Sequence, residues 1–169
     1  MVILQHNIWL MATFRRNLSK VRMTKSVKPD IESIKNFSHF QKIPTRWMDN
    51  DVYQHVNNVV YYSFFDTAVN QYLIEVGVLD IEKSEVIGLV VETQCNYFQP
   101  IKFPDEVTVG IRVDKLGTSS VRYAIGVFKG GETAASAQGH FVHVYVNKAT
   151  MKPAPIVGKL LLALQDLVR

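Results

Sequence analysis

Side chains capable of acid–base and hydrogen-bonding chemistry concentrate in one short stretch of the chain. Two carboxylates, an imidazole and a pair of neighbouring amides lie within ten residues: Asp49, Asp51, His55, Asn57 and Asn58. A carboxylate can attack an acyl carbon directly or activate a water molecule that attacks it. A nearby imidazole or amide can hold the substrate or the water in place. The set is therefore suited to acyl transfer or hydrolysis.

A helix is predicted to begin directly after this stretch and to run from Asn57 to about Glu75. Apolar residues recur there at steps of three and four, Asn57 or Asn58 can cap the first turn, and Gly77 can end the last. The first N–H groups of a helix lack partners within it and lie at the positive end of its dipole. They would stabilise the oxyanion that forms when a thioester or ester carbonyl is attacked.

The motif around Asp51 resembles the signature of a known enzyme family. Its residues are Asp49, Asp51, His55, Val56, Asn57, Asn58 and Tyr61, followed in the helix by Asp66 and Ala68. It resembles the 4-hydroxybenzoyl-CoA-thioesterase-like branch of the hot-dog-fold acyl-CoA thioesterases, and the likeness covers about residues 38–147. The resemblance implies an enzyme that hydrolyses an acyl thioester to a free carboxylic acid and CoA, and that needs no metal or other cofactor.

The resemblance also implies a role for each residue of the motif. Asp51 would be the catalytic carboxylate, acting as general base or as nucleophile. The backbone N–H of Asn58 would donate to the thioester carbonyl, and His55 would bind or orient the substrate or the attacking water. Asn57 and Tyr61 would belong to the substrate-binding set, with Asn57 also shaping the loop or capping the helix.

Two further expectations follow from the family pattern. Gly commonly precedes the histidine, but Gln54 stands there in this chain, and Gly tolerates left-handed backbone angles that Gln does not. The turn is therefore expected to change. Hot-dog sites also form between protomers, so the resemblance implies a homodimer or homotetramer in which Glu92 and Thr93 of the other subunit face Asp51.

Some residues of the motif also have a purely structural interpretation. Asp49 can cap the turn or pair with Arg46. His55 can be an ordinary loop histidine. Asp66, inside the helix, is expected to accept a hydrogen bond at a buried or interface position rather than to act as a second catalytic acid.

Other chemically capable residues are expected to be structural. His140 and His143 are three apart on a predicted strand, so they point to opposite faces and cannot chelate one ion together. Cys95 is expected to be a small core residue rather than a nucleophile. The aromatic residues of the helix are expected to form core, with the lining of an acyl tunnel as the alternative.

The elements that hold the motif predict an α+β domain. Four strands with short turns are expected to follow the helix as an antiparallel meander, at residues 86–98, 106–116, 119–128 and 134–146. A strand over residues 39–48 precedes the motif, and Pro44 indicates an edge or bulge. A short apolar helix over residues 157–168 could pack on the sheet or on a partner. The expected fold is a hot-dog fold, an antiparallel sheet wrapped around one long central helix.

Composition sets limits on the class of protein. The chain has 169 residues, 47% hydrophobic and 20% charged, which predicts one globular domain with its own core. The lone Cys95 cannot form an internal disulfide, and no CxxC, CxxH or HExxH spacing indicates a zinc site. The longest apolar run is too short to span a bilayer, so no integral membrane segment is expected.

Positive charge is concentrated at the N-terminus. Residues 1–28 contain six basic residues and no acidic one, whereas residues 29–169 contain 13 basic and 15 acidic residues. The body therefore offers no basic surface for nucleic acid. The leader resembles a mitochondrial transit segment in composition, with a cytoplasmic protein as the alternative. It could also be a disordered tail, or an upstream extension if translation begins at Met11 or Met23.

Three rival functions compete with the thioesterase. The first is a noncatalytic hot-dog module that binds an acyl chain or assembles with a larger complex. The second is a basic protein of nucleic-acid or membrane surfaces, for which the leader is the sole argument. The third is a hot-dog dehydratase acting on hydroxyacyl thioesters, whose arrangement of a histidine and an acid is not apparent in the sequence.

Overall fold

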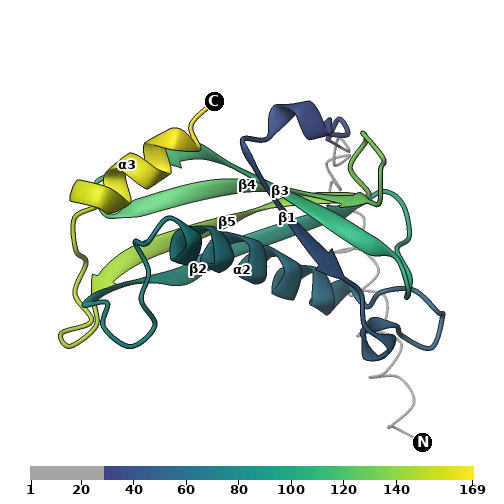
Figure 1. The fold of residues 1–169 in the computed structure, drawn as a ribbon, viewed down its shortest axis with the longest axis horizontal. Helices are drawn as coiled ribbons and strands as arrows, with labels where there is room; N and C mark the ends of the chain where they lie inside the picture. The colour runs from purple at the N-terminus through teal and green to yellow at the C-terminus, as the bar shows by residue number, and fades with distance from the viewer. Residues whose placement is uncertain (1–28) are drawn as a thin grey trace, which may run out of the picture. The chain divides into compact units, whose positions relative to one another are not determined.

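The computed structural model describes residues 29–169, and the unit treated below is Ile31–Arg169 (Figure 1). The leader predicted over residues 1–28 lies outside the described residues. The elements follow in the order η1 (Ile34–Asn36), β1 (His39–Pro44), η2 (Trp47–Asp49), α2 (Asn58–Glu75), β2 (Val86–Tyr97), β3 (Glu106–Leu116), β4 (Ser120–Lys129), β5 (Ala137–Asn147) and α3 (Gly158–Asp166). Within residues 29–169, no helix combines the length and apolar character needed to cross a membrane.

The strands form one antiparallel sheet in the order β1-β3-β4-β5-β2. Strands β3, β4 and β5 follow one another as the predicted meander, and Pro44 ends an edge strand as expected. The predicted meander is wrong for β2, which pairs with β5 at the opposite edge instead of with β3. The connection over residues 98–105 is long enough to carry the chain from that edge to β3, beside β1.

Helix α2 lies against one face of the sheet and buries one side of its surface (Figure 1). The buried residues are Tyr61, Phe64, Phe65, Ala68, Val69, Tyr72 and Leu73. The ring of Phe65 meets that of Phe141 on β5 edge-on, with 5.5 Å between their centroids. Asn57 caps the helix by accepting a hydrogen bond from Val59 N–H at 3.2 Å, and Gly77 follows its end with a φ of 70°. The predicted helix and its aromatic core are confirmed.

Helix α3 packs on the sheet, which is one of the two alternatives for the C-terminal helix. Leu164 and Leu167 are buried, and Val113 N–H on β3 donates to the carbonyl of Leu167 at 2.9 Å. The hydroxyl of Tyr72 on α2 donates to the carbonyl of Ala163 at 2.7 Å. The two helices are thus joined by a buried hydrogen bond as well as by apolar contact.

A second, smaller cluster lies around Phe37, just before β1. A Cβ atom added at Gly110 or Gly126 would come within 2.8 Å or 2.7 Å of the Phe37 side chain, so the ring lies directly on bare backbone. Its edge meets Phe128 at a centroid distance of 5.6 Å, and the Arg112 guanidinium lies 5.0 Å from its centroid. Phe37 therefore covers the strands β3 and β4 where they have no side chains of their own.

Candidate active site

The loop between β1 and α2 is fixed to the connection between β2 and β3. Phe103 N–H donates to the side-chain oxygen of Asn50 at 3.1 Å, and Val56 N–H donates to the carbonyl of Ile101 at 2.8 Å. Val56 is itself buried. Two segments far apart in the sequence are thereby held together beside the start of α2.

Asp49 pairs with Arg46, which is the structural role that the sequence offered for it. Its side chain is 1% exposed and accepts hydrogen bonds from Arg46 Nη2 at 2.8 Å, Arg46 Nε at 3.0 Å and the Arg46 backbone N–H at 2.7 Å. Its carbonyl accepts from Asn57 N–H at 2.8 Å. Because Arg46 and Asp49 cap a 3₁₀ turn together, the predicted strand over residues 39–48 ends early, at Pro44.

Asp51 is held by the backbone of its own loop. Its Oδ1 accepts hydrogen bonds from Tyr53 N–H at 2.8 Å and from His55 N–H at 3.3 Å, while its own N–H donates to the carbonyl of His55 at 2.8 Å. Within residues 29–169, Oδ2 accepts no hydrogen bond. The carboxylate is half-buried, fixed through one oxygen, and keeps the other oxygen available.

Gln54 adopts the left-handed backbone angle usually reserved for glycine. Its φ is 63°, and its N–H donates to the carbonyl of Asp51 at 3.0 Å. The premise that Gln does not adopt a left-handed angle is therefore wrong at this position, where hydrogen bonds around Asp51 hold the loop. A non-glycine residue in this region costs about 1 kcal/mol or more.

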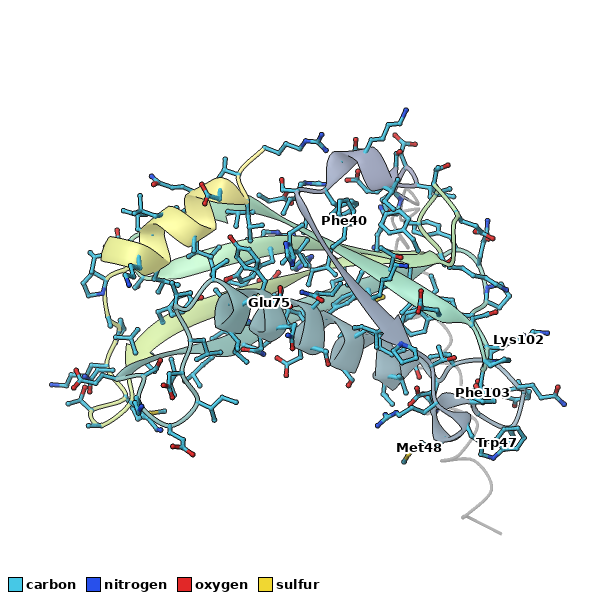
Figure 2. The ribbon with its side chains drawn as sticks, viewed as in Figure 1. Phe40, Trp47, Met48, Glu75, Lys102 and Phe103 are labelled. Atoms are coloured by element: carbon cyan, nitrogen blue, oxygen red, sulfur yellow. The ribbon has the colours of Figure 1, made fainter. Side chains whose placement is uncertain are left out.

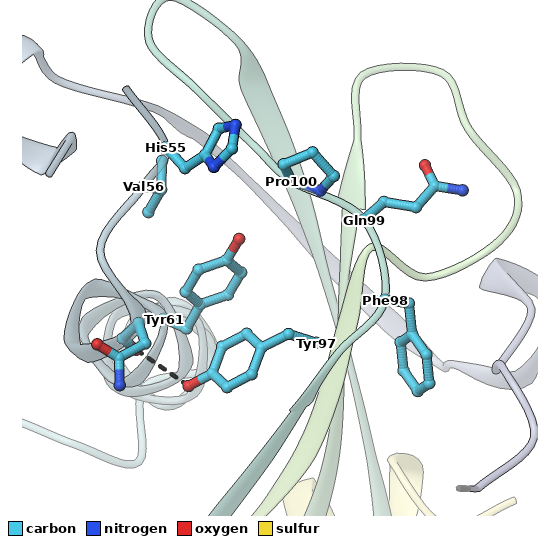
Figure 3. A pocket seen from close by; sticks show the side chains of 8 residues that line it. His55, Val56, Tyr61, Tyr97, Phe98, Gln99 and Pro100 are labelled. Carbon is cyan, nitrogen blue, oxygen red and sulfur yellow. Dashed lines mark hydrogen bonds between the residues drawn. The ribbon is translucent and has the colours of Figure 1, made fainter. Parts of the chain in front are cut away.

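A cavity of about 300 Å³ lies at the start of α2, between the helix and the end of β2 (Figure 3). His55, Asn58 and Tyr61 line it, as the motif predicts for a substrate site, together with Val56, Tyr97, Phe98, Gln99 and Pro100. The carboxylate of Asp51 is not part of its wall. Its Oδ1 accepts a hydrogen bond from the N–H of His55, whose ring faces the cavity, so the carboxylate lies next to a residue of the wall.

The residues from Tyr97 to Pro100 are site residues that sequence reasoning missed. The hydroxyl of Tyr97 donates to the carbonyl of Asn58 at 3.2 Å, and its ring meets Tyr61 edge-on at 5.0 Å (Figure 3). The available signal was an aromatic residue at the end of a strand directly before Pro100. Only the path of the connection between β2 and β3 brings it to the start of α2.

The first turn of α2 presents an uncompensated positive end to this cavity. The Asn57 side chain occupies the N–H of Val59, but Asn58 N–H donates to no group within residues 29–169. No acidic residue stands in the first turn. Burial raises the pKa of Tyr61 to about 12, so its hydroxyl stays protonated and able to donate. The arrangement can stabilise negative charge that develops on a bound carbonyl oxygen.

The structure does not bring Glu92 and Thr93 to the cavity of their own chain. Glu92 points to the face of the sheet opposite α2, where its Oε1 lies 2.8 Å from Nε2 of His140 and 3.7 Å from Arg122. Thr93 donates to the carbonyl of His140 at 3.2 Å. His143, by contrast, lies on the helix-facing side, so the prediction that the two histidines face opposite ways is confirmed.

Asp66 and Cys95 are both expected to be structural rather than catalytic. Asp66 accepts a hydrogen bond from Asn70 at 3.0 Å, as expected of an acceptor, but it is exposed rather than buried in the single chain. Burial raises the pKa of the Cys95 thiol to about 11, which suits a core residue and not a nucleophile. Among the described residues, no group of three or more His, Cys, Asp or Glu side chains could hold a metal ion.

Large apolar side chains stand exposed on the loop beside the cavity. Trp47, Met48, Val52 and Tyr53 are between 76% and 90% exposed. Figure 2 shows Trp47 beside Phe103, and their ring centroids are 5.8 Å apart. The loop that carries Asp51 therefore combines a fixed carboxylate with accessible apolar surface.

Comparison with known proteins shows the family of the chain. A family model described as the thioesterase superfamily matches residues 53–136. The chain is 51% identical to the PA5185 protein from Pseudomonas aeruginosa, with a TM-score of 0.80 over 82% of this chain and 97% of that one. The chain belongs to the thioesterase superfamily. The predicted hot-dog fold and the prediction of a thioester hydrolase are both confirmed.

Two other similar proteins share less sequence identity with the chain. A thioesterase from Thermus thermophilus, solved in complex with coenzyme A and Zn, is 30% identical to this thioesterase-superfamily chain, with a TM-score of 0.66 over 79% of this chain and 96% of that one. The YsmA protein of Bacillus subtilis (strain 168) is 25% identical over 118 residues, which cover 69% of this chain and 78% of YsmA.

Proposed function

We propose that this thioester hydrolase acts on acyl-CoA and that Asp51 is its catalytic carboxylate. The observation that carries the proposal is the position of Asp51 in a loop directly before α2. One of its oxygens is fixed by two backbone N–H groups and the other is available. The helix that follows offers an N–H without a partner in the described chain.

The helix start stabilises the transition state in this proposal. The thioester carbonyl oxygen accepts a hydrogen bond from Asn58 N–H, at the positive end of α2. When the carbonyl carbon is attacked, the negative charge grows on that oxygen, and the donor is already in place to stabilise it. The ring of His55, on the cavity wall, binds or orients the substrate or the attacking water.

Asp51 acts by one of two routes. As a nucleophile, its free oxygen bonds to the acyl carbon, the C–S bond breaks, CoA leaves as the thiolate, and water then hydrolyses the mixed anhydride. As a general base, it takes a proton from water while the water oxygen attacks the same carbon, and the tetrahedral intermediate then breaks its C–S bond and releases CoA as the thiolate. A single turnover in ¹⁸O-labelled water identifies the nucleophilic route if label appears in the Asp51 carboxylate, because this requires a mixed anhydride that water attacks at the Asp51 carboxyl carbon. Attack of water at the acyl carbon places the label in the product acid by either route.

The proposed substrate is an acyl group on CoA, and we favour an aliphatic acyl chain. The Thermus thermophilus relative in complex with coenzyme A supports CoA as the carrier. The phosphates of CoA would lie at the surface near basic side chains. Tyr61, Val56 and Tyr97 make the inner wall of the cavity largely apolar, which suits the acyl group.

Release of free thiol from a series of acyl-CoAs, from short to long chains, tests the proposal. We expect hydrolysis of at least one member, with a chain-length optimum in kcat/KM. Binding of acyl-CoA without thiol release would instead favour the noncatalytic acyl-binding module. Turnover of acyl-carrier-protein thioesters alone would keep the hydrolase and reject the carrier.

We further propose that two copies of the chain associate through β2. Its outer edge is unpaired in the described chain, and Val90 and Val91 on it are 45% and 60% exposed. Such an edge readily pairs with another strand. Two-fold antiparallel pairing places the start of one β2 beside the end of the other. Sedimentation equilibrium should give at least a dimer, and Val91→Lys should shift the mass toward a monomer; a monomeric parent protein would reject this.

A further inference from the structure

A second cavity lies at the other end of α2 and shares no lining residue with the first. Its volume is about 280 Å³, and it lies between the C-terminal half of α2, the start of β2 and strand β5. Asn70 and Leu73 come from α2, Gly88 from β2 and His143 from β5. At 1.5 Å per residue, Leu73 is about 22 Å along the helix from Asn58, so this is a separate place in the chain.

His143 in its wall is a buried polar side chain that makes no side-chain hydrogen bond within residues 29–169. It is 2% exposed, and neither ring nitrogen makes a hydrogen bond within residues 29–169. Its neighbours are the rings of Tyr123, Phe141 and Tyr145, at centroid distances of 5.3, 5.8 and 6.5 Å. Buried polar side chains nearly always have a hydrogen-bond partner, so this imidazole needs an explanation.

The absence of a side chain at Gly88 leaves room beside this imidazole. A Cβ atom added at Gly88 would lie 2.9 Å from Nδ1 of His143 and 3.4 Å from the ring of Tyr145. Gly88 itself is exposed in the single chain and lies on the edge strand, so the cavity opens toward the outer edge of β2. Any larger residue would press on the histidine ring and narrow the cavity.

The remaining walls define what kind of molecule fits. They are mostly aliphatic, with Leu73, Val78, Val86 and Leu160 among them. Burial lowers the pKa of His143 to about 4, so the ring is uncharged at neutral pH and offers one donor and one acceptor. The carboxylate of Asp66 acts on His143 as a nearby negative charge, which disfavours an anion beside the ring.

We propose that this cavity binds an apolar chain that carries an uncharged hydroxyl group, with His143 as the hydrogen-bond partner of that hydroxyl. A hydroxyl both donates and accepts, so it can pair with the neutral imidazole in either tautomer. The aliphatic walls hold the chain, and the hydroxyl pairs with a side chain that has no hydrogen-bond partner among the described residues. The ligand is either a free aliphatic alcohol or the hydroxylated end of an acyl group.

Direct binding tests this site without any turnover, so its outcome does not depend on the proposed function. The probes are 1-hexanol and 1-chlorohexane, which share an apolar chain and differ in the hydroxyl. We expect 1-hexanol to bind about tenfold more tightly and to move the ring ¹⁵N resonances of His143 in the NMR spectrum. His143→Leu should bind both probes equally, and Gly88→Ala should weaken both.

Equal binding of the two probes, or no change at the His143 ring nitrogens when 1-hexanol binds, would overturn the proposal. Because the wild-type protein alone gives this answer, the test does not require that either variant folds.

A second arm distinguishes the two sources of the hydroxyl. The kcat/KM for thiol release is compared between an acyl-CoA and its ω-hydroxyacyl counterpart of equal chain length. A preference for the hydroxylated substrate that His143→Leu abolishes identifies the acyl group as the source. Binding of 1-hexanol without such a preference identifies a free molecule. Loss of all hydrolysis in both would count against the proposed function and leave the result with the alcohols intact.

Discussion

The two ends of α2 hold cavities of similar volume, each beside polar groups that have no hydrogen-bond partner in the part of the chain that the structure describes. At the start of the helix, the unsatisfied groups are a backbone N–H and one oxygen of a fixed carboxylate, both near the surface. At the far end, the unsatisfied group is a neutral imidazole enclosed by apolar side chains. The first arrangement can stabilise charge that develops during a reaction, whereas the second can only recognise an uncharged polar group. If both proposals hold, the start of α2 serves the reaction and its far end binds an uncharged group.

The largest expected difference between the two ends is in turnover. Asp51→Asn keeps the shape of the side chain but removes its basicity and nucleophilicity, so kcat should fall by roughly 10²–10⁴-fold with little change in stability. Glu132→Gln, the same change on an exposed turn, should leave kcat unaltered. Steady-state thiol release measures both. Near-normal turnover of Asp51→Asn on every substrate of the parent would remove Asp51 from the chemistry.

At the far end of α2, His143 should affect how the stability of the protein depends on pH. His143 has a pKa of about 4 when folded and its ordinary 6.5 when unfolded. Below pH 6.5 His143 binds a proton in the unfolded chain but stays neutral in the folded chain. The free energy of unfolding therefore falls as the pH drops toward 4. The loss from this residue should approach ~3 kcal/mol.

Urea unfolding of the wild type and of His143→Leu, at pH 8 and at pH 4.5, isolates this effect. The difference between the two proteins at pH 8 serves as the reference, because the imidazole is neutral in both states there. The variant should lose less stability on acidification than the wild type. Parallel losses would mean that His143 takes up its proton equally well in the folded protein.

The two carboxylates of the site loop should differ in how much they contribute to stability. Asp49→Ala removes the acceptor for three hydrogen bonds from Arg46 and leaves the Arg46 backbone N–H without a partner, so we expect a loss of about 2 kcal/mol in unfolding free energy. Asp51→Asn should lose much less. If Asp49→Ala matched Glu132→Gln in a urea titration, the Arg46 pair would not stabilise the loop.

The smallest expected effect is at Gln54. Gln54→Gly places at φ 63° the residue that adopts this angle without strain. The gain is reduced by the greater freedom of glycine in the unfolded chain, so about 0.5–1 kcal/mol should remain. Calorimetry should show a Tm higher by a few degrees with unchanged kcat. A lower Tm would show that Gln54 stabilises the loop by other means.

Local features of the fold could be predicted from the sequence because neighbouring residues determine them. The cap at Asn57, the end of α2 near Gly77 and the opposite orientation of His140 and His143 all follow from spacing and backbone geometry. The pairing of Arg46 with Asp49 is also local, over three residues. These features needed no knowledge of the sheet.

Features that depend on the order of strands could not be predicted. The residue pattern of β2 does not indicate that it pairs with β5. The position of Tyr97 in the cavity follows from that strand order. An irregularity in register between Val90 and Glu92 likewise affects which residues of β2 face α2. The alternation of a strand predicts the face of His143, but its lack of a partner depends on what other elements place around it.

The ring of Phe37 sets a limit on how far this thioesterase-superfamily chain can be shortened. Gly110 and Gly126 leave bare backbone on the sheet, and the Phe37 ring lies on both positions. A version beginning after residue 37 would open that backbone to water and release the Arg112 guanidinium from the ring. Protein engineers who trim the basic leader should therefore stop before Glu32, whose side chain also binds Arg112.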